Sequence, residues 1–287
     1  MKLARFSIDA QPRLGRIDGD RITDLTAAFP AFGHSMRALL TALPDCRDAV
    51  AHAAGPWHAL ADVRLEAPIT DPQKFLAIGM NYKAHAEESA RGGVPVPKTQ
   101  LWFNKQVSCI AGPYDDIALP TVAPDKVDYE AELAFVIGKR CRHVSRADAR
   151  GVIAGYMLCN DVSTRDWQLA SPTFTLGKSF DTHGPIGPWI TTDDEVADPH
   201  ALELRLFLNG EERQFTSTGD MIYDIHDQIA HLSTVMTLEP GDVIATGTPS
   251  NVGIATGTFL KPDDVVRIEA TGLGHIENRF RPEAALS

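Results

Sequence analysis

The stretch that most constrains this chain covers residues 127–138, where acidic side chains interrupt an otherwise apolar run. In an extended strand, alternate side chains point to opposite faces, so Glu130 and Glu132 share one face and the apolar residues line the other. Two like charges on such a strand repel each other and lose hydration, and they therefore need a compensating cation. A third acid, Asp161, ends a second apolar run at 155–161. We expect these three acids to hold one divalent metal.

The ligand types restrict which metal this site prefers. Carboxylates without His or Cys form a hard oxygen site, which favours Mg²⁺ or Mn²⁺, with Ca²⁺ as an alternative, over Zn²⁺. Three acids leave about three octahedral positions for water or substrate, as in a catalytic site. The alternative interpretation is that Glu130 and Glu132 form ordinary salt bridges on a solvated strand face.

Composition excludes several classes of function. The chain has 287 residues and a net charge of −11, so it offers no basic surface for nucleic acid or an anionic membrane. Its first residues lack an apolar leader, and no later run resembles a membrane span. We expect a soluble cytoplasmic protein. Its cysteines have no CxxC spacing and are expected to be reduced; they are Cys46, Cys109, Cys141 and Cys159.

The chain is expected to contain two domains of the β-rich α+β class. Residues 1–70 form a small N-terminal α+β domain, which includes a hairpin around the turn Asp18-Gly19. Residues 73–287 form the larger domain, because many short strands with few helices follow a Pro-bounded segment. The candidate catalytic, substrate-binding and metal-ligating residues all lie in this second domain.

A short helix is predicted over residues 82–90, directly after a buried strand at 75–79. His85 and Glu88 would face each other on this helix at spacing i, i+3. A Gly- and Pro-rich loop follows, so the segment has the character of a mobile lid that carries a general base. The alternative is an ordinary surface pair with no function.

Five motifs in order resemble the fumarylacetoacetate hydrolase family. They extend over about residues 73–280 and are His85-x-x-Glu88, Glu130-x-Glu132, Asn160-Asp161-x-Ser163-x-Arg165-Asp166-x-Gln168, Gly177-Lys178-Ser179-Phe180-Asp181 and Thr246-Gly247-Thr248-Pro249. One position departs from the family pattern: Asn251 stands where the family often has Gly, although Asn tolerates left-handed backbone. The resemblance implies a rolled, mixed β-sheet and a homodimer.

The resemblance also implies roles for individual residues. The residues that match the Mg²⁺ or Mn²⁺ ligands are Glu130, Glu132 and Asp161. Those that match positions holding the carboxylate and oxo groups of the substrate are Arg165, Gln168 and Thr248. Those implied in catalysis are His85 and Glu88, which activate water, and Lys178, which stabilises developing oxyanion charge.

The implied reaction is metal-dependent hydrolysis of a carbon–carbon bond in a small anionic 2,4-dioxo acid. Acylpyruvates and 2,4-dioxo-3-deoxy sugar acids are the candidate substrates, and pyruvate is one product. Decarboxylation of oxaloacetate, or tautomerisation or isomerisation of a 2-oxo acid, would use the same metal site without water. The presence of His85 and Glu88 favours hydrolysis. A non-catalytic binding protein that keeps the metal site is a further alternative.

Overall fold

A computed structural model describes residues 1–283, and its largest element is a twisted, mixed sheet of twelve strands. In spatial order its main path is β4 (Trp57–Ala59), β3 (Arg21–Asp24), β2 (Gln11–Asp18), β1 (Lys2–Ile8), β14 (Gly184–Thr192), β12 (Ile153–Asn160), β11 (Ala131–Ile137), β17 (Val243–Ala245), β6 (Phe75–Gly79) and β7 (Leu101–Lys105). The branches are β5 (Arg64–Glu66), which pairs with β1, and β8 (Ile110–Ala111), which pairs with β14. Most pairs are antiparallel, but β17 and β6 are parallel, as the predicted mixed sheet requires.

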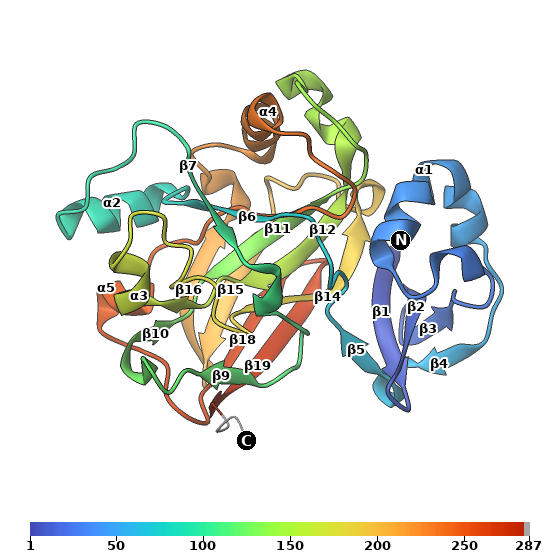
Figure 1. Ribbon diagram of the computed structural model, residues 1–287, viewed down its shortest axis with the longest axis horizontal. Coiled ribbons are helices and arrows are strands. Elements are labelled where there is room, and N and C mark those ends of the chain that lie inside the picture. The colour runs from blue at the N-terminus through green and yellow to red at the C-terminus, as the bar shows by residue number, and fades with distance from the viewer. Residues whose placement is uncertain (284–287) are drawn as a thin grey trace.

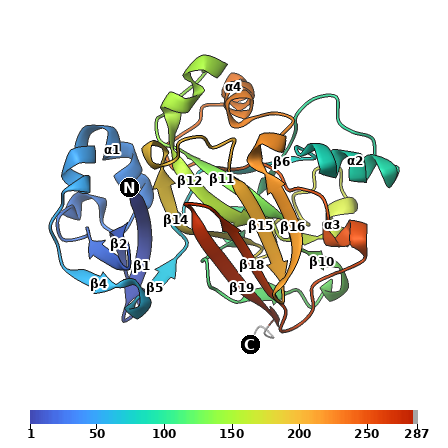
Figure 2. The same cartoon turned by 180° about the vertical axis from the view of Figure 1, so that it is seen from behind.

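A second sheet of five strands covers one side of the large sheet (Figure 2). In order it contains β16 (Glu211–Ser217), β15 (Glu203–Leu208), β18 (Val265–Ala270), β19 (Gly274–Pro282) and β9 (Ile117–Leu119). A pair of two-residue strands, β10 (Val127–Asp128) and β13 (Ser163–Thr164), lies beside the site described below. The β-rich α+β class and rolled sheet predicted from the sequence are confirmed.

Strand β11 lies between two apolar cores. Its alternate residues Leu133 and Phe135 pack in the core that the five-stranded sheet shares, whereas Ala134 and Val136 face a second core containing α1 (Met36–Ala51). A strand buried on both faces can be apolar at successive positions, which explains why β11 is so uniformly hydrophobic. Burial on both faces holds this strand in place, and with it Glu132, the acidic residue that the strand carries.

The N-terminal strands and α1 form one end of the molecule, and β1 joins them to the rest (Figure 1). Lys2 pairs with Thr191 of β14, so the large sheet continues across the predicted domain boundary at 70–73. The division into two domains, like the homodimer, stays a prediction.

The remaining helices are short and lie around the sheets. They are α2 (Lys83–Arg91), α3 (Arg165–Leu169), α4 (Ile225–Val235) and α5 (Gly253–Thr256). The 3₁₀ turns are Pro30–Phe32, Leu60–Asp62, Val107–Cys109, Pro124–Lys126, Arg146–Val152, Asp193–Glu195 and Thr218–Asp220. In residues 1–283, none of the helices combines the length and apolar character that a membrane crossing demands.

Candidate active site

The three predicted metal ligands meet at the ends of neighbouring strands. Glu132 is the second residue of β11, Glu130 immediately precedes that strand, and Asp161 immediately follows β12. Antiparallel pairing of β11 with β12 places Ala131 opposite Asn160 and so brings these ends together. Each acid offers an oxygen within 4.8 Å of the others, and all three side chains are buried. The cluster predicted from two distant sequence motifs is therefore present.

The electrostatic environment of the cluster is uneven. Burial opposes ionisation of Glu130, but the charges of Lys178 and Arg165 hold the pKa of this carboxyl down to about 2. For Glu132, burial and the charges of Asp161 and Glu130 together raise the pKa well above its ordinary value. A bound cation would offset that excess of negative charge. The hard oxygen donors and the undercompensated Glu132 thus fit a divalent metal.

Two lysines stabilise the cluster from inside the protein. Lys178 Nζ lies 2.8 Å from Glu130 Oε2 and 2.7 Å from Asp161 Oδ2, so it bridges two of the acids. Lys105, at the end of β7, places Nζ 2.7 Å from Asp161 Oδ1 and donates to the main-chain oxygens of Val162 and Lys178. Sequence reasoning missed Lys105, because no motif connects it with residues 161–178. These ion pairs are buried, which contradicts the alternative of a solvated strand face.

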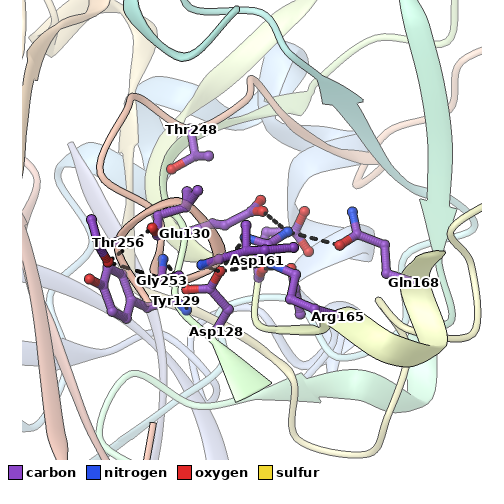
Figure 3. A network of polar contacts seen from close by, with 12 residues as sticks. Asp128, Tyr129, Glu130, Asp161, Arg165, Gln168, Thr248, Gly253 and Thr256 are labelled. Atoms are coloured by element: carbon purple, nitrogen blue, oxygen red, sulfur yellow. Dashed lines mark hydrogen bonds and ion pairs between the residues drawn. The ribbon is translucent and has the colours of Figure 1, made fainter. Parts of the chain in front are cut away.

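Arg165 joins the acid cluster to a fourth carboxylate, Asp128 (Figure 3). Its Nε lies 2.7 Å from Asp128 Oδ2, while Nη1 lies 2.7 Å from Glu130 Oε1 and 2.8 Å from Gln168 Oε1. Asp128 also accepts hydrogen bonds from the backbone N–H groups of Gly253 and Ile254. Sequence reasoning missed Asp128, although its position two residues before Glu130 could have suggested that it faces the same way.

The loop carrying Thr248 is attached to the acid strand by Gln214. Gln214 Oε1 accepts from the backbone N–H of Ala131, and its Nε2 donates to Thr248 Oγ1 at 3.1 Å. Gln214 belongs to β16, and the sequence gives no sign of this link. Asn251 adopts φ of +70°, a left-handed conformation that Asn tolerates better than most residues other than Gly.

The predicted pair on α2 is present. His85 Nδ1 lies 3.0 Å from Glu88 Oε2, and Glu88 Oε1 accepts the backbone N–H of Asn251 at 2.9 Å. Burial favours the neutral carboxyl, but these two hydrogen bonds, together with nearby positive charge that includes Arg91, lower the pKa of Glu88. A carboxylate only accepts hydrogen bonds, so His85 Nδ1 carries the proton in this pair.

A cavity of about 150 Å³ brings most of the predicted residues into one site. Its walls include His85, Glu130, Glu132, Arg165, Gln168, Lys178 and Thr248. The two remaining residues lie behind this wall, with Glu88 bonded to His85 and Asp161 bonded to Lys178. The arrangement combines the buried acid cluster, two paired cations and a histidine around a space for a small ligand.

Comparison with known proteins identifies the family. Residues 74–281 match the model described as fumarylacetoacetate (FAA) hydrolase C-terminal, and residues 1–68 match one described as Rv2993c-like, N-terminal. The chain therefore belongs to the fumarylacetoacetate hydrolase family.

Individual relatives cover nearly the whole chain. A mitochondrial oxaloacetate tautomerase of Xenopus laevis is 42% identical over 97% of this chain and 89% of its own length. The crystal structure of maleylpyruvate hydrolase from Sphingobium sp. SYK-6 with manganese(II) and pyruvate matches with TM-score 0.83 and 36% identity, over 98% of this chain and 99% of that one. The 5-carboxymethyl-2-hydroxymuconate delta-isomerase of Mycobacterium smegmatis matches with TM-score 0.80 and 36% identity, over 99% and 100%. The relatives thus include a hydrolase, an isomerase and a tautomerase.

Proposed function

We propose that this protein is a metal-dependent hydrolase that cleaves the C3–C4 bond of a 2,4-dioxo acid to give pyruvate and a second carboxylic acid. The observation that carries this proposal is the hydrogen-bonded His85–Glu88 pair, whose histidine lines the same cavity as Glu130 and Glu132. Only hydrolysis needs a base that activates water. The maleylpyruvate hydrolase structure, which holds manganese and pyruvate, supports the same chemistry.

Glu130, Glu132 and Asp161 would hold Mg²⁺ or Mn²⁺. When bound, the metal would supply Lewis-acid chemistry, polarising oxygens of the substrate's carboxylate and 2-oxo groups. Lys178 and Lys105 keep the acids in place around that position, since each donates to Asp161 from buried positions. The cofactor assignment thus rests on buried donors that this chain itself provides.

The tautomer of His85 suits a general base. Because Nδ1 donates to Glu88, Nε2 is left with a lone pair that can accept a proton from water. Water then adds through its oxygen to C4, the C3–C4 bond breaks with its electron pair moving toward C3, and a proton delivered to C3 completes pyruvate. Glu88 is a positioning residue here, because it acts through His85.

The cavity cations would bind and stabilise negative charge. Arg165 offers planar donors to the substrate carboxylate, and Gln168 and Thr248 add neutral donors beside it. Lys178 would stabilise charge that develops on the C4 oxygen. Both cations already contact the acid cluster, so substrate binding would redistribute existing ion pairs instead of burying new isolated charges.

A second candidate is tautomerisation of oxaloacetate, which the 42% identical Xenopus relative favours. The same cavity could move a proton between C3 and the 2-oxo oxygen without adding water. Decarboxylation of oxaloacetate would likewise leave the His85–Glu88 pair without a water to activate.

These activities can be separated by one set of assays. The full chain with Mn²⁺ or Mg²⁺ is expected to release pyruvate from 2,4-dioxopentanoate, and excess EDTA should abolish the release. Oxaloacetate is assayed in parallel for pyruvate release and for keto–enol interconversion by ultraviolet absorbance. Rapid interconversion of oxaloacetate with no cleavage of any 2,4-dioxo acid would reject the hydrolase proposal in favour of the tautomerase.

A further inference from the structure

The part of the cavity wall that does not belong to the acid cluster is mainly apolar. Six of the apolar side chains that form it come from three segments far apart in the sequence: Val94, Leu101, Leu169, Phe174, Val252 and Ile254. Phe174 also packs edge-on against Phe103, with ring centroids 6.0 Å apart. The tertiary fold brings these side chains together, because no single apolar stretch of the sequence contains all of them.

No cation of the cavity faces this apolar wall without a partner. Arg165 is paired with Asp128 and Glu130, and Lys178 with Glu130 and Asp161. His85 is hydrogen-bonded to Glu88. Arg165 and Lys178 are therefore both held at the acid cluster, where the 2-oxo acid end of a substrate would bind. A second carboxylate placed farther out would be desolvated with no partner.

Large apolar side chains also remain exposed at the rim of this cavity. Val94, in the loop after α2, is 47% exposed, Leu169 of α3 is 66% exposed, and Ile254 of α5 is 42% exposed. Exposed apolar groups from three segments around one opening are typical of a site that buries an apolar group.

We propose that this wall selects substrates whose group beyond C4 is an uncharged, apolar acyl tail. The proposal rests on the function proposed above and narrows it, because it favours simple acylpyruvates over dioxo sugar acids and over dioxo acids with a second carboxylate. The apolar tail gains from leaving water at this wall, whereas a charged or hydroxylated tail loses hydrogen bonds that the six apolar side chains do not replace. Ser89, which also lines the cavity, offers one hydroxyl and no charge.

The test uses ligands that the enzyme cannot hydrolyse. Calorimetry on the full chain loaded with Mn²⁺ compares 2-oxohexanoate with 2-oxoadipate, which have equal chain length and differ in a terminal carboxylate. We expect 2-oxohexanoate to bind roughly tenfold more tightly, because only its tail can be buried without a partner. Equal or tighter binding of 2-oxoadipate, or no binding of either acid, would overturn the proposal.

Two matched variants test whether the difference in affinity between the two acids arises at this wall. Ile254→Arg places a cation at the rim and should bring the two affinities to within about threefold, since the new charge can pair with the distal carboxylate. Val235→Arg, at a 63% exposed position of α4 outside the cavity, should keep the wild-type ratio. An unchanged ratio in a folded Ile254→Arg protein would contradict contact between this wall and the tail.

The outcome separates the two proposals. If 2-oxohexanoate is preferred but 2,4-dioxohexanoate is not cleaved, the hydrolase proposal fails and the tail preference stands. If 2,4-dioxo acids are cleaved while both 2-oxo acids bind equally, the hydrolase proposal stands and the tail preference fails.

Discussion

The acid cluster and α2 contribute to one cavity but are held in very different ways. Glu132 lies on a strand paired on both sides and buried on both faces, and its neighbours Lys105 and Lys178 are fully enclosed. Helix α2 buries only Ala86 and ends in a Gly-Gly loop. Stability is unequally distributed in such a structure, because a segment with few buried contacts opens more readily than a central strand.

Hydrogen bonds attach α2 and the residue segment just before it to the rest of the protein. At its base, Asn81 is buried and its amide donates to the carbonyls of Tyr223 and Thr246. Farther along, Glu88 accepts the N–H of Asn251. We propose that a helix attached in this way moves as a lid over substrate while the acid cluster stays fixed, and this difference makes separate predictions for the two regions.

The largest effect is expected from Glu132→Gln. The amide retains the shape and can still accept the N–H of Gly247, which lies 2.8 Å from the carboxylate, but it removes a charged metal ligand. Mn²⁺ affinity, measured by titration calorimetry, should fall by more than roughly a hundredfold, the upper range for residues that only support a ligand. Activity should fall with it.

Glu269→Gln is the matched control, because this glutamate lies at the protein surface in β18. It should bind Mn²⁺ as the wild type does. Wild-type Mn²⁺ affinity in the Glu132→Gln protein would reject the central role of the acid cluster.

His85→Ala should separate catalysis from metal binding. Loss of a general base slows a reaction by about 10²–10⁴-fold, so hydrolysis of 2,4-dioxopentanoate should decrease by that amount. Mn²⁺ affinity should not change, because His85 is bonded to Glu88 and not to the acids. Steady-state kinetics and calorimetry on the same preparation check both statements. An unchanged kcat would reject His85 as the general base.

The sequence predicted the parts of the site that depend on local pattern. Alternation along 127–138 placed Glu130 and Glu132 on one face, and the i, i+3 spacing brought His85 to Glu88. Such relations need only the geometry of one strand or one helix. The class of fold was also predictable, because strand-length apolar runs and turn residues recur along the chain.

The partners supplied by distant segments could not be predicted from pattern alone. Lys105 reaches Asp161 across 56 residues of sequence and Gln214 reaches Ala131 across 83, because strand order brings them together. A buried lysine is also the opposite of what residue type suggests, since Lys is rarely enclosed unless paired. The join of β1 to β14 was missed for the same reason: no local signal specifies which edges of a sheet meet.

Lys105→Met tests whether the buried lysines compensate the cluster in the absence of metal. The substitution leaves Asp161 with one cationic partner, so the metal-free protein should lose about 3 kcal/mol of unfolding free energy. Mn²⁺ should restore more stability to this variant than to the wild type, because the metal replaces the missing positive charge. Urea unfolding with and without Mn²⁺ measures both effects.

Lys74→Met provides the comparison for that experiment. Lys74 pairs with buried Asp242 at 2.8 Å, outside the cavity, so its loss should destabilise the protein without any additional rescue by Mn²⁺. Equal rescue of both variants would show that Lys105 has no special relation to the cluster.

The smallest effect concerns the pH dependence of the hydrogen bond between Glu88 of α2 and the backbone of Asn251. The pKa of Glu88 is lowered in the folded chain, so this contact adds stability above the ordinary carboxyl pKa of about 4.3 and loses it as pH falls through the lower folded value. This hydrogen bond should contribute less than about 1 kcal/mol to the unfolding free energy, because the pair is partly open to solvent.

Amide hydrogen exchange at Asn251, referenced to the Gly253 amide in the same loop, should therefore show protection at pH 6 that decreases below pH 4. In Glu88→Gln the ratio of the two amides should not depend on pH. A ratio that changes equally in both proteins would indicate that α2 is held to the Asn251 loop by contacts other than this carboxylate.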